Sequence, residues 1–328
     1  MKAIVHDEYG PPDVLKLVDV DPPTPKEREI LLKVHAAALN PLDWHLIRGE
    51  PSVMRLGGKP KARIPGADVA GTVEAVGPGV QRFRRGDQVL GTVRGSFAEY
   101  ACGHEDRFAL KPARMTFEHA ATIPVAGCTA LVALRNYGRV KAGQSVLVNG
   151  ASGGVGTFAV QIATAFGTRV TGVCSARNLE LVRSLGAEHV IDYAKDDFTR
   201  QATRYDLILN VAGNASVSDT RRALAPHGAL VVVGAGVGRQ TDGGITLSGM
   251  LSLAFVALAS RFGQQKVSMV LGKPVQSDDL AFIAKLVEDG NVTPVVDRTY
   301  VLADAAEAVR YLEAGHVRGK VVVTPPPA

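Results

Sequence analysis

The stretch VLVNGASGGVG, Val146 to Gly156, decides the fold expected for this chain of 328 residues. An apolar, β-branched run is followed by glycines and then by the helix-spaced apolar run FAVQIATAFG. This order predicts a buried strand that turns sharply into a helix. Gly150, Gly153 and Gly156 are spaced as GxxGxxG, and in a GxGxxG alignment Ala151 takes the first glycine position. Such a bare turn lets the backbone approach a pyrophosphate, so the stretch predicts a dinucleotide site.

The same alternation of strands and helices continues through residues 124–273. TRVTGVC leads to the helical pattern NLELVRSLG, and HVIDY, DLILNVA, ALVVVG and KVSMVL follow as apolar, strand-like runs. Near-continuous apolar strands that alternate with amphipathic helices predict a parallel sheet covered on both faces. The predicted fold class is therefore α/β, with a doubly wound parallel sheet in this region.

The two flanking regions have a different pattern. Residues 1–123 contain short β-like runs, such as MKAIVH and EILLKVHAAAL, separated by Pro and Gly, which predicts an irregular β-rich domain. Residues 274–328 read as helix, strand, helix and strand. A chain of this length also favours two domains over a single core.

The composition is that of an ordinary globular protein, with 46% hydrophobic and 21% charged residues. The net charge of +5 is spread along the chain, and the densest basic cluster, RFRR at Arg82 to Arg85, is short and contains a single aromatic, Phe83. We interpret that cluster as a solvated loop and expect no nucleic-acid binding. Cys102, Cys128 and Cys174 show no CxxC spacing, and MKAIVHDEYGPP has no signal-peptide pattern, so we expect a cytoplasmic protein.

The most apolar later stretch is ITLSGMLSLAFVALAS, Ile245 to Ser260. Its 16 residues fall short of the ~20 that a spanning helix needs, so we expect no membrane insertion. We interpret it as an apolar helix that covers the substrate as a lid. A subunit interface and a plain core helix are the alternatives.

The end of the second predicted strand, TGVCSARN, bears on the choice of cofactor. An NAD enzyme usually places Asp or Glu there to bind the ribose 2′-hydroxyl. This chain has Cys174, Ser175, Ala176 and Arg177 instead. A guanidinium forms charge-assisted hydrogen bonds to a 2′-phosphate, so NADPH is the predicted cofactor. The alternative is that Arg177 is a solvated residue at the start of a helix.

Five motifs, together with the order of the domains, carry a family resemblance. They are NPLDW at Asn40 to Trp44, PGADVAGTVEAVG at Pro65 to Gly77, GSFAEY at Gly95 to Tyr100, AGCTAL at Ala126 to Leu131 and GHVRGKVVV at Gly315 to Val323. The chain resembles the medium-chain dehydrogenase/reductase superfamily, in its zinc-independent NADPH:quinone oxidoreductase branch. The resemblance implies a GroES-like catalytic domain in 1–123, a Rossmann NADP-binding domain in 124–273 and a C-terminal segment, 274–328, that returns to the catalytic domain.

We expect no bound zinc. Zinc alcohol dehydrogenases have a cysteine at the position of Asn40 and a His-Glu pair at the positions of Ala67 and Asp68, and an alanine has no atom that ligates a metal. The four-cysteine structural loop of that family is also missing. Cys102 and His104 are two candidate ligands without partners, and we interpret both as surface residues.

The resemblance implies roles for individual residues in a cleft between the domains, with Asn40 and Asp43 as catalytic residues near the nicotinamide. The implied cofactor-binding residues are Asn40, Pro41, Thr129, Gly153, Gly154, Val155, Cys174, Ser175, Arg177, Tyr193, Asn210, Val211, Val233, Gly234, Ala235, Arg318, Gly319 and Lys320. Alternative interpretations stay open for three of the candidates. Asp43 would brace its loop, Thr129 would bond its own helix backbone, and Asn210 would form an ordinary turn at a strand end.

The expected reaction is hydride transfer from NADPH to a quinone. Without a Lewis acid, an alcohol substrate lacks stabilisation for its alkoxide, whereas a quinone or an activated C=C bond carries its own electron demand. Pro51 stands where enoyl reductases of the family have a proton-donating tyrosine, which favours quinones over enoyl substrates. The alternatives are a reductase of α,β-unsaturated aldehydes or ketones and a weakly catalytic NADPH-binding redox sensor. The expected partners are a small hydrophobic acceptor and a second copy in a possible homodimer.

Overall fold

The computed structural model describes residues 1–50, 55, 57–60, 62–234, 264–270 and 275–326. Pro51, Ala235 and the apolar stretch 245–260 lie outside the described residues. The chain divides into two compact units. The first unit comprises Met1–Cys128, Pro274–Gly290 and Pro294–Ala328, and the second comprises Thr129–Lys273 and Asn291–Thr293. The division falls inside helix α3 (Pro124–Val132), after Cys128.

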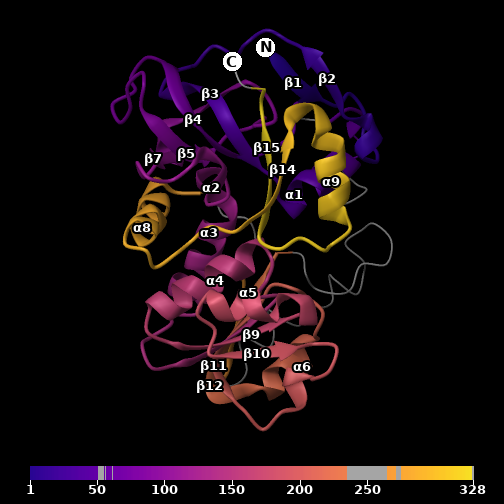
Figure 1. Ribbon diagram of the computed structural model, residues 1–328, viewed down its shortest axis with the longest axis vertical. Helices are drawn as coiled ribbons and strands as arrows, with labels where there is room; N and C mark the ends of the chain where they lie inside the picture. Colours follow the sequence, from indigo (N-terminus) through magenta and orange to yellow (C-terminus); the bar gives the residue numbers. More distant parts are fainter. Residues whose placement is uncertain (51–54, 56, 61, 235–263, 271–274, 327–328) are drawn as a thin grey trace. The chain divides into compact units, whose positions relative to one another are not determined.

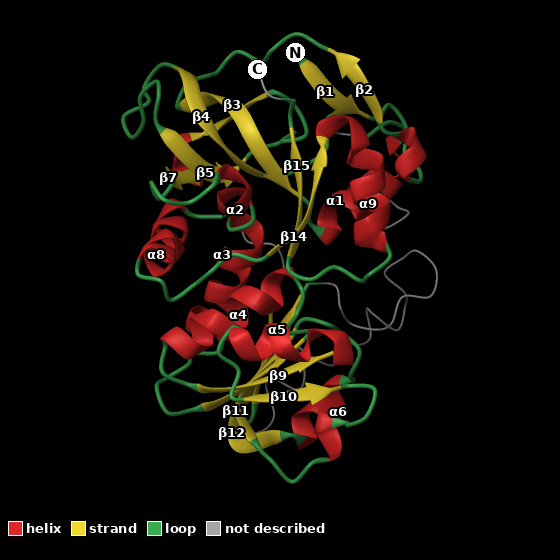
Figure 2. Ribbon diagram, in the orientation of Figure 1, coloured by secondary structure: helices red, strands yellow, loops and turns green. Residues whose placement is uncertain are grey.

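The second unit contains a six-stranded parallel sheet with the strand order β10-β9-β8-β11-β12-β13 (Figure 2). The first strand in the chain lies inside the sheet and later strands extend it in both directions, so the predicted doubly wound fold is confirmed. The strands are β8 (Ser145–Asn149), β9 (Arg169–Cys174), β10 (His189–Asp192), β11 (Tyr205–Asn210), β12 (Leu224–Val233) and β13 (Lys266–Val270).

Helices connect these strands and pack on them. Helix α4 packs against β8 and β9, α5 against β9 and β10, and α6 against β12. Strand residues Leu147, Val173, Ile208, Leu230 and Val232 form a buried cluster, and full burial of such a side chain contributes about 1.5–3 kcal/mol. The helical segments of this unit are the π-helical turn η4 (Ala133–Tyr137), α4 (Gly154–Ala165), η5 (Ala176–Asn178), α5 (Leu179–Ser184), η6 (Phe198–Arg200) and α6 (Val217–Arg222).

The first unit is β-rich, as predicted for the start of the chain. Its seven-stranded sheet has the order β14-β15-β3-β4-β5-β7, with β6 also paired to β3, and β1 and β2 form a separate pair. The strands are β1 (Lys2–Val5), β2 (Lys16–Asp19), β3 (Glu29–Ala38), β4 (Asp68–Val76), β5 (Gln88–Thr92), β6 (Tyr100–His104), β7 (Phe108–Leu110), β14 (Val296–Val301) and β15 (Lys320–Thr324). The strand β15, from the C-terminal part of the chain, lies antiparallel beside the carboxyl end of β3, which comes from the N-terminal part (Figure 1).

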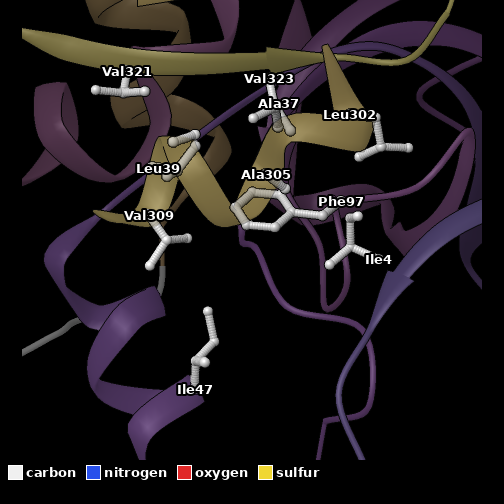
Figure 3. Packing of buried hydrophobic residues seen from close by; sticks show 11 residues of the cluster. Ile4, Ala37, Leu39, Ile47, Phe97, Leu302, Ala305, Val309, Val321 and Val323 are labelled. Carbon is white, nitrogen blue, oxygen red and sulfur yellow. The ribbon is translucent and has the colours of Figure 1, made fainter. Parts of the chain in front are cut away.

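Helices α1 and α9 complete a core with β15 and β1. Figure 3 shows Leu39, Ile47, Phe97, Val309 and Val321 of this cluster, which come from segments far apart in the sequence. All five are at most 1% exposed, so the C-terminal residues are integral to the core of this unit. The helical segments here are η1 (Pro12–Val14), α1 (Pro41–Arg48), η3 (Glu105–Arg107), α2 (Phe117–Ala121), α8 (Ser277–Glu288), η7 (Leu302–Asp304) and α9 (Ala305–Glu313). In the described part of the chain, every helix is too short or too polar to cross a membrane.

Candidate functional site

The glycine turn after β8 has the geometry that a dinucleotide needs. Gly150 has φ +90°, a conformation that side chains disfavour. A Cβ atom on Gly156 would lie 2.0 Å from the Gly150 carbonyl oxygen, so α4 approaches the turn this closely only without a side chain there. A Cβ on Gly153 would meet nothing nearer than that same oxygen at 3.6 Å. A Cβ at Gly153 would thus make only an ordinary van der Waals contact, which leaves room beside the turn for an external group such as a pyrophosphate.

The turn leads into the N-terminus of α4, a helix of 12 residues. Gly153 precedes the helix, Gly154 and Val155 begin it, and all three are partly exposed. The free backbone N–H groups and the partial positive charge of a helix N-terminus favour an anion. These three predicted residues are thus brought together where a phosphate would be stabilised.

The carboxyl ends of the parallel strands bring further candidates to one edge of the sheet. Asn149 is in register with Val173 and with Asn210, so β8, β9 and β11 end side by side. Cys174 is the last residue of β9, and Val233 is the last residue of β12. This is the edge at which doubly wound sheets bind their ligands. Val211 and Gly234 directly follow two of these strands and are partly exposed.

Asn210 uses its side chain within the protein. Its Oδ1 accepts from Asn149 Nδ2 at 2.9 Å and from the Gly213 N–H at 3.2 Å. Asn149 Nδ2 also donates to Asn214 Oδ1 at 2.7 Å. The side-chain oxygen of Asn210 thereby stabilises the turn after β11, as in the turn-forming alternative. Its predicted cofactor contact stays a prediction.

The tip of β9 carries hydroxyl and guanidinium groups and no carboxylate. Ser175 is half-buried and Arg177 is exposed. The Cys174 thiol is buried, and burial together with the nearby Asp192 carboxylate raises its pKa to about 11, so it is neutral at pH 7. Tyr193 follows the neighbouring strand, is 55% exposed, and donates its backbone N–H to the Cys174 carbonyl at 3.2 Å.

Two residues at this edge of the sheet, Ser152 and Asn178, were not predicted from the sequence. Asn178 Nδ2 donates to Ser152 Oγ at 2.9 Å and to Ser175 Oγ at 3.2 Å. The available signals were a serine inside the glycine turn and an asparagine directly after Arg177. Both residue types are common in turns and helix caps, so the pattern alone does not distinguish them.

In the first unit, Asn40, Asp43, Asp68 and Lys320 form a buried polar network, and each residue is at most 5% exposed. Asn40 comes two residues after β3, Asp68 begins β4 and Lys320 begins β15. Strands β4 and β15 both run antiparallel to β3, so their first residues meet the end of β3. The sheet topology thereby gathers residues that are up to 280 positions apart.

The Lys320 ammonium is fully hydrogen-bonded inside this network. Its Nζ donates to the Leu39 carbonyl at 2.7 Å, to Asn40 Oδ1 at 2.7 Å and to Asp68 Oδ2 at 3.2 Å, which uses its three N–H groups. Asp68 also accepts from Asn40 Nδ2 at 3.0 Å and from the Val125 N–H at 2.9 Å. Burial raises the pKa of the Asp68 carboxyl, and the Lys320 ammonium and these donors oppose that shift. The cofactor contact predicted for Lys320 stays a prediction.

Asp43 caps the start of α1. Its Oδ2 accepts from the Asn40 N–H at 2.7 Å, and its own N–H donates to the Asn40 carbonyl at 2.9 Å. Burial raises the pKa of this carboxyl from 3.8 to about 7, and the nearby Asp68 carboxylate adds to the shift. This geometry matches the bracing alternative for Asp43, while the catalytic roles of Asn40 and Asp43 stay predictions.

From the sequence, Asp68 counted only as a residue that replaces a zinc ligand. Its place at the centre of the buried polar network was not predicted. Its signal was a lone carboxylate within the small and apolar run PGADVAG. Only the pairing of β4 with β3, and of β3 with β15, brings that carboxylate to an ammonium and an amide.

The remaining predicted residues belong to different elements. Pro41 is the exposed first residue of α1, and Thr129 is half-buried in α3, where its hydroxyl has no hydrogen-bond partner among the described residues. Arg318 is exposed and donates its backbone N–H to Asp297 Oδ2 at 3.0 Å. Gly319 has φ +78°, and a Cβ there would lie 2.4 Å from a backbone oxygen of the neighbouring segment. The fold of the first unit therefore requires glycine at position 319, because a side chain there would collide with the backbone.

The described ranges contain no group of three or more His, Cys, Asp or Glu side chains that could hold a metal ion. Burial raises the pKa of the Cys102 thiol to about 11, with the Glu29 carboxylate adding to the shift. His104 Nδ1 accepts from the Asp106 N–H at 3.3 Å. These two residues thus have the environments of ordinary structural side chains, and the expectation of no zinc stays a prediction.

Two family matches cover most of the chain. Residues 26–162 match the family described as alcohol dehydrogenase GroES-like domain, and residues 185–323 match the family described as zinc-binding dehydrogenase. The chain is 32% identical to the chloroplastic quinone-oxidoreductase homolog of Spinacia oleracea, over 99% of this chain and 98% of that protein. It is 35% identical to the chloroplastic NADPH-dependent alkenal/one oxidoreductase of Arabidopsis thaliana, over 100% of this chain and 80% of that protein.

Solved structures agree with these matches. The quinone oxidoreductase of Coxiella burnetii superposes with a TM-score of 0.84 at 32% identity, over 99% of both chains. The Escherichia coli quinone oxidoreductase complexed with NADPH has a TM-score of 0.83 at 25% identity, over 99% of this chain and 100% of that chain. The chain thus has a dinucleotide turn and relatives above 30% identity along its whole length. It belongs to the medium-chain dehydrogenase/reductase superfamily, in its quinone-oxidoreductase-like branch, and is an oxidoreductase that binds NAD(P)H.

Proposed function

We propose that this chain reduces quinones with NADPH and does so without zinc. The observation that carries the proposal is the tip of β9. Ser175 there shares the donor Asn178 with Ser152 of the glycine turn, and residues 174–177 include a guanidinium and no carboxylate. Three relatives support quinone as the acceptor or NADPH as the cofactor. Two of them are named as quinone oxidoreductases, and one is named as NADPH-dependent. NADPH, when bound, supplies a hydride to an electron-poor acceptor.

The residues of the second unit would hold and orient this cofactor. The backbone N–H groups at Gly153, Gly154 and Val155 would bind the pyrophosphate. Ser175 and Arg177 would bind the 2′-phosphate, the hydroxyl by a hydrogen bond and the guanidinium by charge-assisted ones. Holding both reactants in one geometry lowers the entropic part of the barrier, which is the main contribution required when the acceptor carries its own electron demand.

The residues of the first unit favour acceptors that need no Lewis acid. Asn40 and Ala67 stand where zinc enzymes of the superfamily have ligands, and Asn40 already bonds Lys320 and Asp68. Pro51 has no proton to donate, so the proton that completes reduction would come from solvent. These features support a quinone, which needs no dedicated protein acid.

Reduction of the C=C bond of α,β-unsaturated aldehydes or ketones is the second candidate. The observation in its favour is the 35% identity to a relative named as an alkenal/one oxidoreductase. Both reactions deliver a hydride to an electron-poor carbon or oxygen, so the cofactor site serves either one.

A panel of acceptors tests the proposal. We would measure kcat/KM for 9,10-phenanthrenequinone, 1,4-benzoquinone, trans-2-hexenal and but-3-en-2-one, each with NADPH and with NADH. We expect the quinones to give the higher kcat/KM and NADPH to be at least about tenfold better than NADH. Higher kcat/KM for the enones would favour the second candidate, and equal use of NADH would contradict the cofactor choice. Tight NADPH binding without turnover of any acceptor would indicate a sensor.

A further inference from the structure

Asn178 connects two segments of the cofactor edge that are separate in the chain. Its side-chain nitrogen donates to Ser152 in the glycine turn and to Ser175 at the tip of β9. Asn178 is 3% exposed, whereas both serines are partly exposed. The amide is thus a buried bridge between two serines that are themselves partly exposed.

The orientation of this amide is unusual for its place in the chain. Asn178 ends the 3-10 turn η5 and directly precedes α5, where the side-chain oxygen of an asparagine can accept a backbone N–H of the first turn. Here α5 has no such side-chain cap, and Asn178 Oδ1 is buried with no hydrogen-bond partner among the described residues. A buried unpaired oxygen is unfavourable, and capping the helix would relieve it. The side chain therefore serves the two serines instead of its own helix.

The proton arrangement follows from this contact. A serine hydroxyl has one hydrogen to donate and lone pairs with which to accept. Because Ser152 and Ser175 both accept from Asn178, each hydroxyl keeps its own hydrogen for another acceptor. Neither hydroxyl donates to a group in the part of the chain that the structure describes. Two O–H donors are thereby held close together at the accessible edge.

We propose that Asn178 is a positioning residue for the 2′-phosphate of NADPH, and that Ser152 joins Ser175 as a direct hydroxyl ligand of that phosphate. The proposal rests on the proposed function, in its choice of NADPH. A phosphate oxygen only accepts hydrogen bonds, so two fixed hydroxyl donors match it. The 2′-hydroxyl of NADH also has a hydrogen to donate, and residues 174–177 supply no carboxylate to accept it. Asn178 therefore contributes to discrimination between the two cofactors.

The decisive measurement is the ratio of dissociation constants for NADH and NADPH, determined by calorimetry on the full-length protein. Asn178→Ala removes the bridge and should weaken NADPH about tenfold, while changing NADH less than about threefold. Asn178→Asp should weaken NADPH more, on the order of a hundredfold, because a carboxylate draws both hydroxyl hydrogens inward and repels the phosphate. Asn136→Asp, an exposed site in the same unit with the same charge change, is the matched control and should alter neither constant.

Ser152→Ala tests the second half of the proposal without altering the bridge residue. It should weaken NADPH about tenfold in the natural background and have little further effect in Asn178→Asp, because the hydroxyl is already turned away. Arg177→Ala should lower the preference for NADPH in every background, since it acts on the phosphate directly.

The outcomes distinguish an error in the choice of NADPH from an error in the role of Asn178. If the unaltered protein binds NADH as well as NADPH, the choice of NADPH in the proposed function is wrong. If it prefers NADPH but Asn178→Ala or Asn178→Asp weakens both cofactors equally, Asn178 only stabilises the fold and the inference is overturned. Should those variants fail to fold, an unchanged cofactor ratio in Ser152→Ala overturns it independently.

Discussion

Lys320 and Asp68 form an ion pair from which water is excluded, since their side chains are 4% and 0% exposed. The Coulombic gain of a buried pair is largely offset by desolvation, so the pair as a whole adds little net stability. Removing one partner is different, because the remaining charge stays buried without compensation. The Leu39 carbonyl and the Asn40 side chain would also lose their donor.

Lys320→Met should therefore destabilise the first unit by about 3–5 kcal/mol. The protein has a single tryptophan, Trp44 in α1, so its fluorescence during urea unfolding reports on this unit. Adding Asp68→Asn to Lys320→Met should restore much of the loss, because the unpaired carboxylate is then gone. Lys285→Met, which removes an exposed pair with Asp289, should cost less than about 1 kcal/mol. Equal costs for the two single variants would contradict this account of Lys320.

Asp43 should make the stability of the first unit depend on pH. Its folded pKa of about 7 lies above the ordinary 3.8, so between these values the folded state binds a proton that the unfolded state has lost. Stability from this group is full below pH 4 and falls as pH rises toward 7, by up to about 1.4 kcal/mol per pH unit. Asp43→Asn stays neutral and keeps an acceptor for the Asn40 N–H, so its curve should be flatter.

The comparison requires urea unfolding, followed by Trp44 fluorescence, at pH 5, 6, 7 and 8. The difference between the unaltered protein and Asp43→Asn isolates this carboxyl from all other titrating groups. Asp278→Asn, at an exposed position of α8 in the same unit, should run parallel to the unaltered protein. A constant difference between Asp43→Asn and the unaltered protein across this range would show that Asp43 is ionised throughout.

At the scale of the element, the turn from β8 into α4 contains glycines with different physical requirements. Gly156 is needed by the protein itself, because a side chain there would collide with the Gly150 carbonyl. Gly153 is not, since its φ of −83° suits any residue and a Cβ there would make only an ordinary van der Waals contact. The sequence pattern does not distinguish the two glycines. Only the contacts in the structure show that Gly156 is needed for packing and that Gly153 is available for the approach of a ligand.

Gly156→Ala should destabilise the second unit by about 1–3 kcal/mol, because the added methyl overpacks the turn. Hydrogen exchange should show faster exchange of the backbone amides in β8 and β9. Gly153→Ala should leave this exchange unchanged and weaken NADPH about tenfold by occupying the space of the pyrophosphate. Normal NADPH affinity in Gly153→Ala would place the pyrophosphate elsewhere.

At the scale of the whole molecule, the expected absence of zinc governs the kind of acceptor that the protein reduces. Dialysis against a chelator should leave kcat for quinones unchanged, and elemental analysis should find well under one zinc per chain. The physical reason is the donor set: Asn40 and Ala67 replace a thiolate and an imidazole, which are strong zinc ligands. A zinc alcohol dehydrogenase treated in parallel serves as the control. Activity that is lost on chelation and regained with added zinc would refute the prediction.

Most of the second unit was predictable because its information is local. The strands are apolar runs, most connections between them contain glycines or a helical pattern, and parallel pairing follows from this alternation. The doubly wound parallel sheet and the glycine turn were confirmed on these grounds, whereas the strand order is known only from the structure. In the first unit, the helix, strand, helix and strand predicted for residues 274–328 are α8, β14, α9 and β15. Its N-terminal part was predictable only as β-rich, since the short strands there pair across long stretches of chain. The predicted homodimer and the cytoplasmic location stay predictions.

The sequence by itself determined the doubly wound sheet, the bare turn before α4 and the tip of β9 without a carboxylate. Each depends on a few adjacent residues whose conformational preferences do not change with context. Only the tertiary structure decided that Asp68 and Lys320 would share one buried network with Asn40, and that Asn178 would bridge two serines. Those contacts depend on sheet register and on the packing of distant segments, and the burial that shifts the pKa of Asp43 exists only once they have formed.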